Sequence, residues 1–100
     1  MRVLNADKLD EFATQHPTSR QTIAKWIDRI QAVEATNLLE LRQAFAKSVD
    51  LIEGTTYCFN LGGNKARIIA VVIFIEGDVI IENVFTHVEY DRWSKTRKKG

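Results

Sequence analysis

The chain has 100 residues, of which 45% are hydrophobic and 27% are charged, and this length and composition predict one globular domain spanning residues 1–100. The single cysteine, Cys58, excludes an internal disulfide. No apolar run approaches the roughly 18 residues of a membrane span, and the first residues lack the apolar core of a signal peptide. We therefore expect a cytoplasmic protein with no membrane partner.

The positive charge is concentrated at the C-terminal end of the sequence. Five of the fourteen lysines and arginines lie in residues 92–99, whereas the first 91 residues carry nine such cations against thirteen acids. A basic C-terminal tail, residues 92–100, favours an RNA, DNA or other anionic partner. A chain end that is simply solvated accounts for the same charges, so the pattern leaves both interpretations open.

The N-terminal segment has the spacing of a short helix. Asn5 or Asp7 is predicted to cap it, and the apolar face would be formed by Leu9, Phe12 and Ala13. The helix must end near Gln15, because Pro17 disfavours helical geometry in the residue before it.

A second helix is predicted to begin at Thr18, because Thr18 and Gln21 have the spacing of a capping box. Its apolar residues recur at helical spacing and form one stripe: Ile23, Trp26, Ile27, Ile30 and Val33. After a connection at residues 34–36, Asn37 and Glu40 can cap a short third helix. The stripe of the second helix is the natural cover for a sheet formed by the rest of the chain.

The second half of the chain changes to strand periodicity. Three stretches are rich in β-branched and aromatic residues, namely residues 55–61, 67–75 and 79–86. The turns at residues 62–63 and 77–78 are short enough to force hairpins, so the strands are predicted to be antiparallel neighbours. This order predicts an α+β fold in which N-terminal helices pack on an antiparallel β-meander. A last helical turn is expected from about Val88.

Two cations follow the first of these turns. Lys65 and Arg67 are two residues apart, so both side chains project from the same face of the strand. A planar guanidinium beside an ammonium makes a good phosphate clamp. Charges next to a hairpin turn are also commonly solvated, and the pattern taken alone favours that simpler interpretation.

His87 and Tyr90 lie at and just beyond the end of the third predicted strand. If that strand runs unbroken, His87 shares a face with four upstream residues: Val79, Ile81, Asn83 and Phe85. If the chain then turns helical, His87 and Tyr90 lie on one face. An imidazole suited to acid–base chemistry would then lie beside a phenol that can stack on a base or donate a proton. A strand-end histidine with a purely structural role remains the simpler alternative.

The other reactive side chains indicate no further site. His16 is far from His87 in the sequence and there is no cysteine pair, so no metal site is expected. Cys58 is predicted to be a buried strand thiol and not a nucleophile. The GGNK stretch lacks the glycine spacing and the following helix of a phosphate-binding loop.

Two segments carry a resemblance to a known family. Residues 59–72, FNLGGNKARIIAVV, and residues 84–93, VFTHVEYDRW, are similar to motifs of the HigB toxins of bacterial toxin–antitoxin pairs, which belong to the RelE-like mRNA interferases. The pattern is F-N-L-G-G-N-K with an arginine two residues further, followed after an apolar strand by T-H-x-E-Y-D. Many members carry an aromatic residue between the lysine and the arginine, where this chain has Ala66.

The resemblance implies a RelE-like fold and an endoribonuclease that inhibits translation by cleaving mRNA on the ribosome. In such toxins the 2′-hydroxyl attacks the adjacent phosphate without a metal or another cofactor. By this resemblance, Arg67 and Lys65 would bind the phosphate and His87 would perform acid–base chemistry. Tyr90 would stack on a base or assist proton transfer.

The resemblance also implies partners. Asn64 and Asp91 would orient the RNA, and three residues of the basic tail would contact ribosomal RNA: Arg92, Lys95 and Lys98. A helix-turn-helix antitoxin similar to HigA would hold the toxin inactive, and operator DNA would be bound only through the complex. Two alternatives have the same sequence features: a non-catalytic RNA- or ribosome-binding module of the same fold, and a protein that serves only as an interaction surface.

Overall fold

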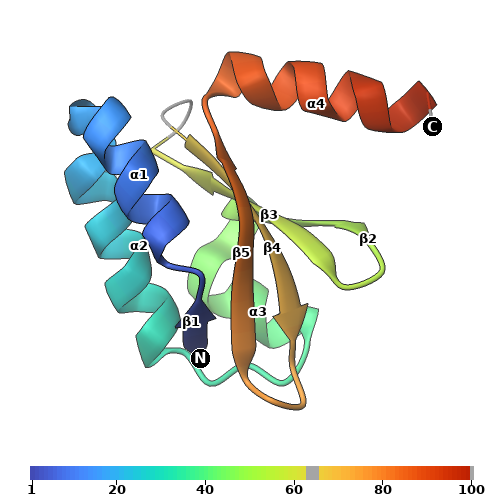
Figure 1. The fold of residues 1–100 in the computed structure, drawn as a ribbon. Coiled ribbons are helices and arrows are strands. Elements are labelled where there is room, and N and C mark those ends of the chain that lie inside the picture. The colour runs from blue at the N-terminus through green and yellow to red at the C-terminus, as the bar shows by residue number, and fades with distance from the viewer. Residues whose placement is uncertain (63–65, 100) are drawn as a thin grey trace.

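The computed structural model describes residues 1–62 and 66–99, with side chains up to residue 97. A five-stranded sheet in the order β1-β5-β4-β3-β2 separates three N-terminal helices from a C-terminal helix (Figure 1). The strands are β1 (Arg2–Leu4), β2 (Val49–Glu53), β3 (Thr56–Leu61), β4 (Ala66–Ile73) and β5 (Asp78–Phe85). The helices are α1 (Asp7–Gln15), α2 (Arg20–Ala32), α3 (Leu38–Phe45) and α4 (His87–Lys99). The predicted α+β class is confirmed.

The three predicted strands are present as antiparallel neighbours, but the sheet is larger than the predicted meander. β1 pairs parallel with β5, which makes the sheet mixed, and β2 pairs antiparallel with β3. The sequence of β2 gave no strand signal because β2 is a sheet edge on which Leu51 is exposed, so its apolar residues do not alternate cleanly.

The predicted starts of the first two helices are wrong. Asn5 adopts a left-handed conformation with φ of 63°, and its side-chain amide donates to the Ile81 carbonyl instead of capping α1. Residues Pro17–Ser19 form a 3₁₀ turn before α2 begins at Arg20. Proline at the start of this turn provides the fixed φ that the turn needs, so the helical signal begins before the α-helix does.

The start of the third helix is predicted correctly. The Asn37 Oδ1 atom accepts a hydrogen bond of 2.9 Å from the Glu40 amide. The Glu40 carboxylate in turn accepts a bond of 2.7 Å from the Thr36 amide. Two amides that would otherwise lack a helical partner are thereby satisfied.

The predicted stripe of α2 does cover the sheet. Ile23, Trp26 and Ile30 are buried in one core with residues from the sheet and α3. The Trp26 ring centroid lies 5.1 Å from that of Phe59 on β3, and the Phe59 centroid lies 5.4 Å from that of Phe45 on α3. Edge-on aromatic packing of this kind adds to the stabilisation from burial alone, and it fixes α2 and α3 on the same face of the sheet.

A bulge in β5 reverses the faces that the sequence predicted. Ile69 pairs with Asn83 whereas Ala70 pairs with Ile81, so Glu82 is an extra residue in the ladder. Upstream of it, Val79 and Ile81 belong to the helix-covered core. Downstream, Asn83 and Phe85 point to the opposite face, and His87 begins a helix. The expectation that His87 continues the face of Val79 and Ile81 is therefore wrong.

Two side chains at the start of α1, one just before the helix and one in its first turn, stabilise this bulge. β1 pairs with β5 only as far as Ile80, so the carbonyls that follow have no strand partner on that side. The Asn5 amide donates to the Ile81 carbonyl at 3.3 Å, and the Lys8 ammonium donates to the Glu82 carbonyl at 2.8 Å.

The predicted final helical turn is the first turn of a longer helix. α4 has 13 residues, His87–Lys99, and most of the segment predicted as a basic tail is its C-terminal half. Within the described part of the chain, no helix is both long and apolar enough to cross a membrane.

An ion pair between the exposed Arg2 side chain on β1 and the buried Asp78 carboxylate on β5 predicts a loss of stability in acid. Arg2 donates to the Asp78 carboxylate from Nε at 2.8 Å and from Nη2 at 3.0 Å. These bonds lower the pKa of Asp78, while burial opposes them. Because the pKa is lower in the folded state, this stabilisation is present above the unfolded value of about 3.9 and disappears as the pH falls through the folded value.

Denaturant unfolding of the wild type and of Asp78→Asn measures this effect. We expect the wild type to be more stable at pH 7 and its advantage to shrink as the pH falls below about 4. An advantage that stayed constant down to pH 2 would show that the carboxylate is not the stabilising group.

Candidate functional site

The predicted site residues meet on the face of the sheet opposite α1–α3. Arg67 on β4 lies directly across from Asn60 on β3 and from Phe85 on β5. The chain leaves β5 beside Arg67 and enters α4, which carries His87, Tyr90 and Asp91. We call these four side chains, Arg67, His87, Tyr90 and Asp91, the clamp cluster.

A capping box explains why α4 begins at His87. The Thr86 hydroxyl accepts a bond of 3.2 Å from the Glu89 amide, and the Glu89 carboxylate accepts a bond of 2.8 Å from the Thr86 amide. This reciprocal pair stops the strand and starts the helix within one residue. It places His87 in the first turn of α4, on the same face as Tyr90 and Asp91. The Thr86-x-x-Glu89 spacing is a capping-box signal in the sequence that predicts this helix start.

Arg67 and His87 are in direct contact. The Arg67 Nη2 atom lies 3.2 Å from the His87 Nδ1 atom. Because a guanidinium has no acceptor, Nδ1 must accept the bond, and a neutral ring then carries its proton on Nε2. The Nε2 atom lies 3.5 Å from the Asp91 carboxylate, and the His87 and Asp91 side chains are 44% and 53% exposed. The imidazole is thus held at both nitrogens and remains open to solvent.

The Tyr90 ring packs against the Arg67 guanidinium. The Arg67 Cζ atom lies 5.9 Å from the Tyr90 ring centroid, a cation–π contact. The Trp93 ring lies beside both Tyr90 and Phe85, at centroid distances of 5.9 Å and 5.6 Å. Burial raises the pKa of Tyr90, and Cys58 and Asp50 raise it further, against the opposite effect of Arg67. The phenol is therefore protonated at neutral pH.

A short polar chain lies under the clamp cluster. The Cys58 thiol is within 3.6 Å of the Asn60 Oδ1 atom, and the Asn60 amide donates to the Asp50 carboxylate at 3.4 Å. Cys58 also interacts with the Tyr90 hydroxyl. Asp50 and Asn60 were not predicted as site residues, because the register of β2, β3 and β4 brings them beneath the cluster and local spacing does not reveal that register.

The predicted inert character of Cys58 leads to a chemical test. The thiol is 2% exposed, and burial raises its pKa to about 11. Since the thiolate is the reactive form, we expect the native protein to resist alkylation by iodoacetamide at pH 8 and to react rapidly once unfolded in guanidinium chloride. Rapid stoichiometric alkylation of the native protein at that pH would contradict this environment.

Of the other predicted residues, only Arg92 and Lys95 have described side chains. Lys65 and Asn64 lie outside the described residues. Arg92 and Lys95 are exposed further along α4, and the side chain of Lys98 is not among those described. Among the described residues, no group of three His, Cys, Asp or Glu side chains is placed to hold a metal ion.

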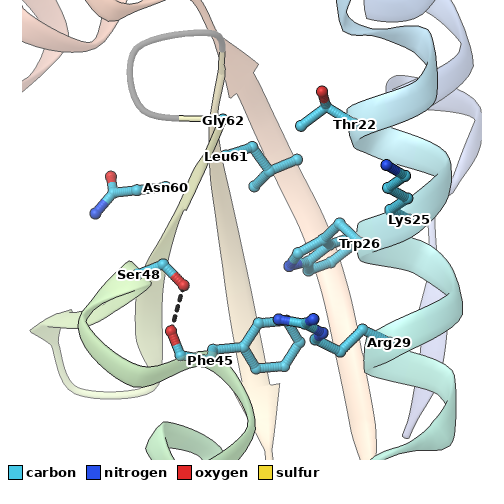
Figure 2. Close-up of a pocket in the computed structure, with 9 residues that line it drawn as sticks. All are labelled: Thr22, Lys25, Trp26, Arg29, Phe45, Ser48, Asn60, Leu61 and Gly62. Carbon is cyan, nitrogen blue, oxygen red and sulfur yellow. Dashed lines mark hydrogen bonds between the residues drawn. The ribbon is translucent and has the colours of Figure 1, made fainter.

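Two hollows lie near the cluster. One of about 250 Å³ lies between β2 and α4, where Arg97 pairs with Glu53 and covers the Trp93 ring at 4.9 Å. The other, of about 340 Å³, opens on the helical side between α2 and the end of β3 (Figure 2).

Comparison with known proteins indicates a family. The model of the HigB toxin family, described as the RelE-like toxic component of a toxin–antitoxin system, matches residues 19–93. The mRNA interferase toxin HigB of Escherichia coli (strain K12) is 44% identical over 45 residues, which are 44% of this chain and 43% of that protein. The mRNA interferase HigB of Shigella flexneri matches to the same extent.

A more distant relative aligns over a longer stretch. The mRNA interferase HigB of Escherichia coli O6:H1 is 22% identical over 96 residues, which are 95% of this chain and 93% of that protein. The chain spans less than half the length of the relatives that it matches at 44% identity.

Proposed function

The chain belongs to the HigB family, the RelE-like toxic component of toxin–antitoxin systems, and we propose that it is an endoribonuclease that cleaves mRNA on the ribosome and so inhibits translation. The observation that carries the proposal is the part-buried contact between Arg67 and His87, at 3.2 Å. Arg67 provides a permanent positive charge and His87 provides an imidazole that can exchange a proton, and the two groups lie side by side. Cleavage of a phosphodiester needs both.

The proposed reaction uses the RNA's own 2′-hydroxyl as nucleophile. Its oxygen forms a bond to the adjacent phosphorus while the bond from phosphorus to the 5′ oxygen breaks. The products are a 2′,3′-cyclic phosphate and a free 5′-hydroxyl. The 2′-hydroxyl proton passes to a base, and the leaving oxygen takes a proton from an acid, so charge and atoms balance without water, metal or cofactor.

Arg67 is assigned to the reacting phosphate. The transition state carries more negative charge on the phosphate oxygens than the substrate does, and a guanidinium can donate two parallel bonds to them. Lys65, which comes just before β4, is proposed to add a second positive charge. The first turn of α4 lies beside the same volume, and its backbone amides also favour an anion there.

His87 is assigned to proton transfer. When the phosphate accepts the hydrogen bonds of the Arg67 guanidinium, Nδ1 of His87 becomes available to accept the 2′-hydroxyl proton. Asp91 then faces the Nε2–H and stabilises the imidazolium that forms, which is an orienting role. Asn64 is proposed as a second orienting group.

Tyr90 is assigned to positioning and stacking. Its hydroxyl interacts with Cys58, and its raised pKa makes it a poor base. The ring holds Arg67 in place through the cation–π contact, and the neighbouring aromatic surface suits a nucleobase. Donation of a proton to the leaving oxygen is a second role for Tyr90, less favoured than positioning and stacking.

The proposed partners follow from the charges and the family. Arg92, Lys95 and Lys98 on α4 would contact ribosomal RNA, with an affinity that falls as salt rises. A co-encoded helix-turn-helix antitoxin similar to HigA would neutralise the toxin, and the complex would bind operator DNA. The site of action would be the cytoplasm.

A defined mRNA incubated with translating ribosomes and purified protein tests the proposal. Primer extension should reveal new 5′ ends that depend on the protein, and expression in cells should arrest growth. Salt-sensitive binding to RNA or ribosomes with no new ends would support the non-catalytic module instead and would overturn the proposed activity.

A further inference from the structure

The hollow of about 340 Å³ between α2 and β3 has an apolar floor and a polar rim (Figure 2). Its floor is formed by Trp26, Phe45 and Leu61, all buried in the core. Its rim is formed by polar groups on α2, on the turn after α3 and at the end of β3. The volume is at the lower end of the range for small-ligand sites, roughly 300–1,000 Å³.

Two cations border the hollow. Lys25 and Arg29 lie one turn apart on α2, and both side chains extend along the same wall (Figure 2). Neither lies within 4.0 Å of an acidic group among the residues that the structure describes. The Arg29 guanidinium lies 5.9 Å from the Phe45 ring centroid. Positive charge is thus present here with no neutralising acid within 4.0 Å in the described part of the chain.

A buried donor in the floor has no acceptor among the described residues. The Trp26 side chain is 5% exposed, and its Nε1 atom has no hydrogen-bond partner in the described part of the chain. Figure 2 shows that the indole nitrogen faces the hollow. An unsatisfied buried N–H costs about 1–3 kcal/mol. Lys25 and Arg29 are long and exposed, so they can move aside to let an acceptor approach this N–H.

The hollow adjoins the clamp cluster across one strand. Asn60 lines its rim and lies directly across from Arg67 in the sheet. β2 pairs with β3 only as far as Phe59, so the edge of β3 is open at Asn60 and Leu61. Adjacent strands are about 4.8 Å apart. An RNA strand held at Arg67 can therefore pass over this open edge and reach the hollow.

We propose that the hollow binds a nucleotide of the RNA next to the one that is cleaved. Lys25 and Arg29 would hold its phosphate, and the base would lie against the aromatic floor with its acceptors toward the Trp26 N–H. This inference rests on the proposed function. An acidic segment of the antitoxin would also suit the two cations, but the aromatic rings of the floor and the continuity with Arg67 favour a nucleotide.

The Trp26 indole provides a direct measurement of binding. The chain has two tryptophans, so a ¹⁵N spectrum of the wild type shows two indole signals, and Trp93→Phe assigns the remaining one to Trp26. We expect a short 2′-O-methylated oligonucleotide of mixed sequence, which cannot be cleaved, to shift the Trp26 signal saturably. Inorganic phosphate alone should shift it less. A Trp26 signal that does not move when the oligonucleotide binds would overturn the inference.

Removing the two cations tests the same site by affinity. For Lys25→Gln/Arg29→Gln we expect binding of the oligonucleotide to weaken roughly tenfold at 0.1 M salt and the salt slope to fall by about 1.4, as for two lost phosphate contacts. The matched control, Arg20→Gln/Lys47→Gln, removes the same charge from exposed positions outside the hollow and should change neither quantity much. Equal losses in both variants would show that net charge, and not the hollow, is responsible.

The outcomes separate this inference from the proposed activity. Cleavage by the wild type with an unmoved Trp26 signal leaves the activity standing and removes the hollow from RNA binding. A shifted Trp26 signal with no cleavage on translating ribosomes does the reverse. If Lys25→Gln/Arg29→Gln binds RNA normally but is no longer neutralised by the antitoxin, the hollow faces a protein and the inference is wrong.

Discussion

Replacing Arg67 by alanine should reduce mRNA cleavage by about 10²–10³-fold, which is the usual cost of removing one donor that stabilises developing negative charge. The reduction should appear in the rate at saturating ribosomes, because the guanidinium is needed most in the transition state. Initial rates from quantitative primer extension measure it. Growth arrest on expression should disappear with the same change.

Two variants show what the arginine contributes. Arg67→Lys keeps the charge but loses the planar fork and the cation–π geometry over Tyr90, so its rate should lie between those of the wild type and Arg67→Ala. Arg20→Ala removes an exposed arginine from the opposite face and should leave the rate unchanged. If Arg67→Ala cleaves at the wild-type rate while remaining folded, the clamp cluster is not the catalytic site.

Replacing His87 by glutamine should reduce cleavage by about 10²–10⁴-fold, the range expected for the loss of a general acid–base group. Glutamine can still accept a hydrogen bond from Arg67, so the variant removes proton transfer while preserving the nearby contact. Circular dichroism and thermal unfolding should be close to those of the wild type, because His87 is exposed at the start of α4.

The other histidine of the chain provides the matched control. His16 packs on Phe12 at the end of α1, with ring centroids 4.4 Å apart, on the opposite side of the sheet from the clamp cluster. His16→Gln should therefore retain wild-type cleavage. Equal losses in His16→Gln and His87→Gln would indicate a general effect on folding and would remove the evidence for His87 as the acid–base group.

Much of the fold follows from local signals in the sequence. The stripe of α2, the cap at Asn37 and the hairpin near Gly77 depend on short-range spacing, and all of them correspond to observed structure. The turn of that hairpin is longer than predicted: it spans residues 74–77, and Asp78 is already paired with Ile73 in the ladder. The edge strands of the sheet were harder to predict. β1 has three residues and is held by pairing with β5, which is a contact across most of the chain and leaves no periodic pattern of its own.

The candidate site depended on two features that strand periodicity misses. The bulge at Glu82 reverses the face of β5, and the Thr86–Glu89 capping box converts the expected strand end into a helix. Together they bring His87 next to Arg67. A regular alternation of side chains along β5 would instead have placed the two residues on opposite faces of the sheet. The family motifs indicated the candidate residues, whereas the bulge and the capping box explain how Arg67 and His87 meet.

The polar support beneath the cluster was not predictable from local sequence. Asp50, Cys58 and Asn60 are brought together by the register of β2 and β3, and a shift of one residue would send each to the other face. Cys58 was predicted only as a buried thiol. In the structure it also lies close enough to Tyr90 to raise the pKa of the phenol.

The central claim is that the RNA's own 2′-hydroxyl attacks a phosphate held between Arg67 and His87. A defined mRNA with a single 2′-deoxynucleotide on the 5′ side of the mapped cleavage position tests it on translating ribosomes. We predict that cleavage at that position is lost, while the unmodified mRNA yields a 2′,3′-cyclic phosphate and a 5′-hydroxyl. Cleavage of the deoxy-substituted position at an undiminished rate, with a 5′-phosphate product, would contradict the mechanism.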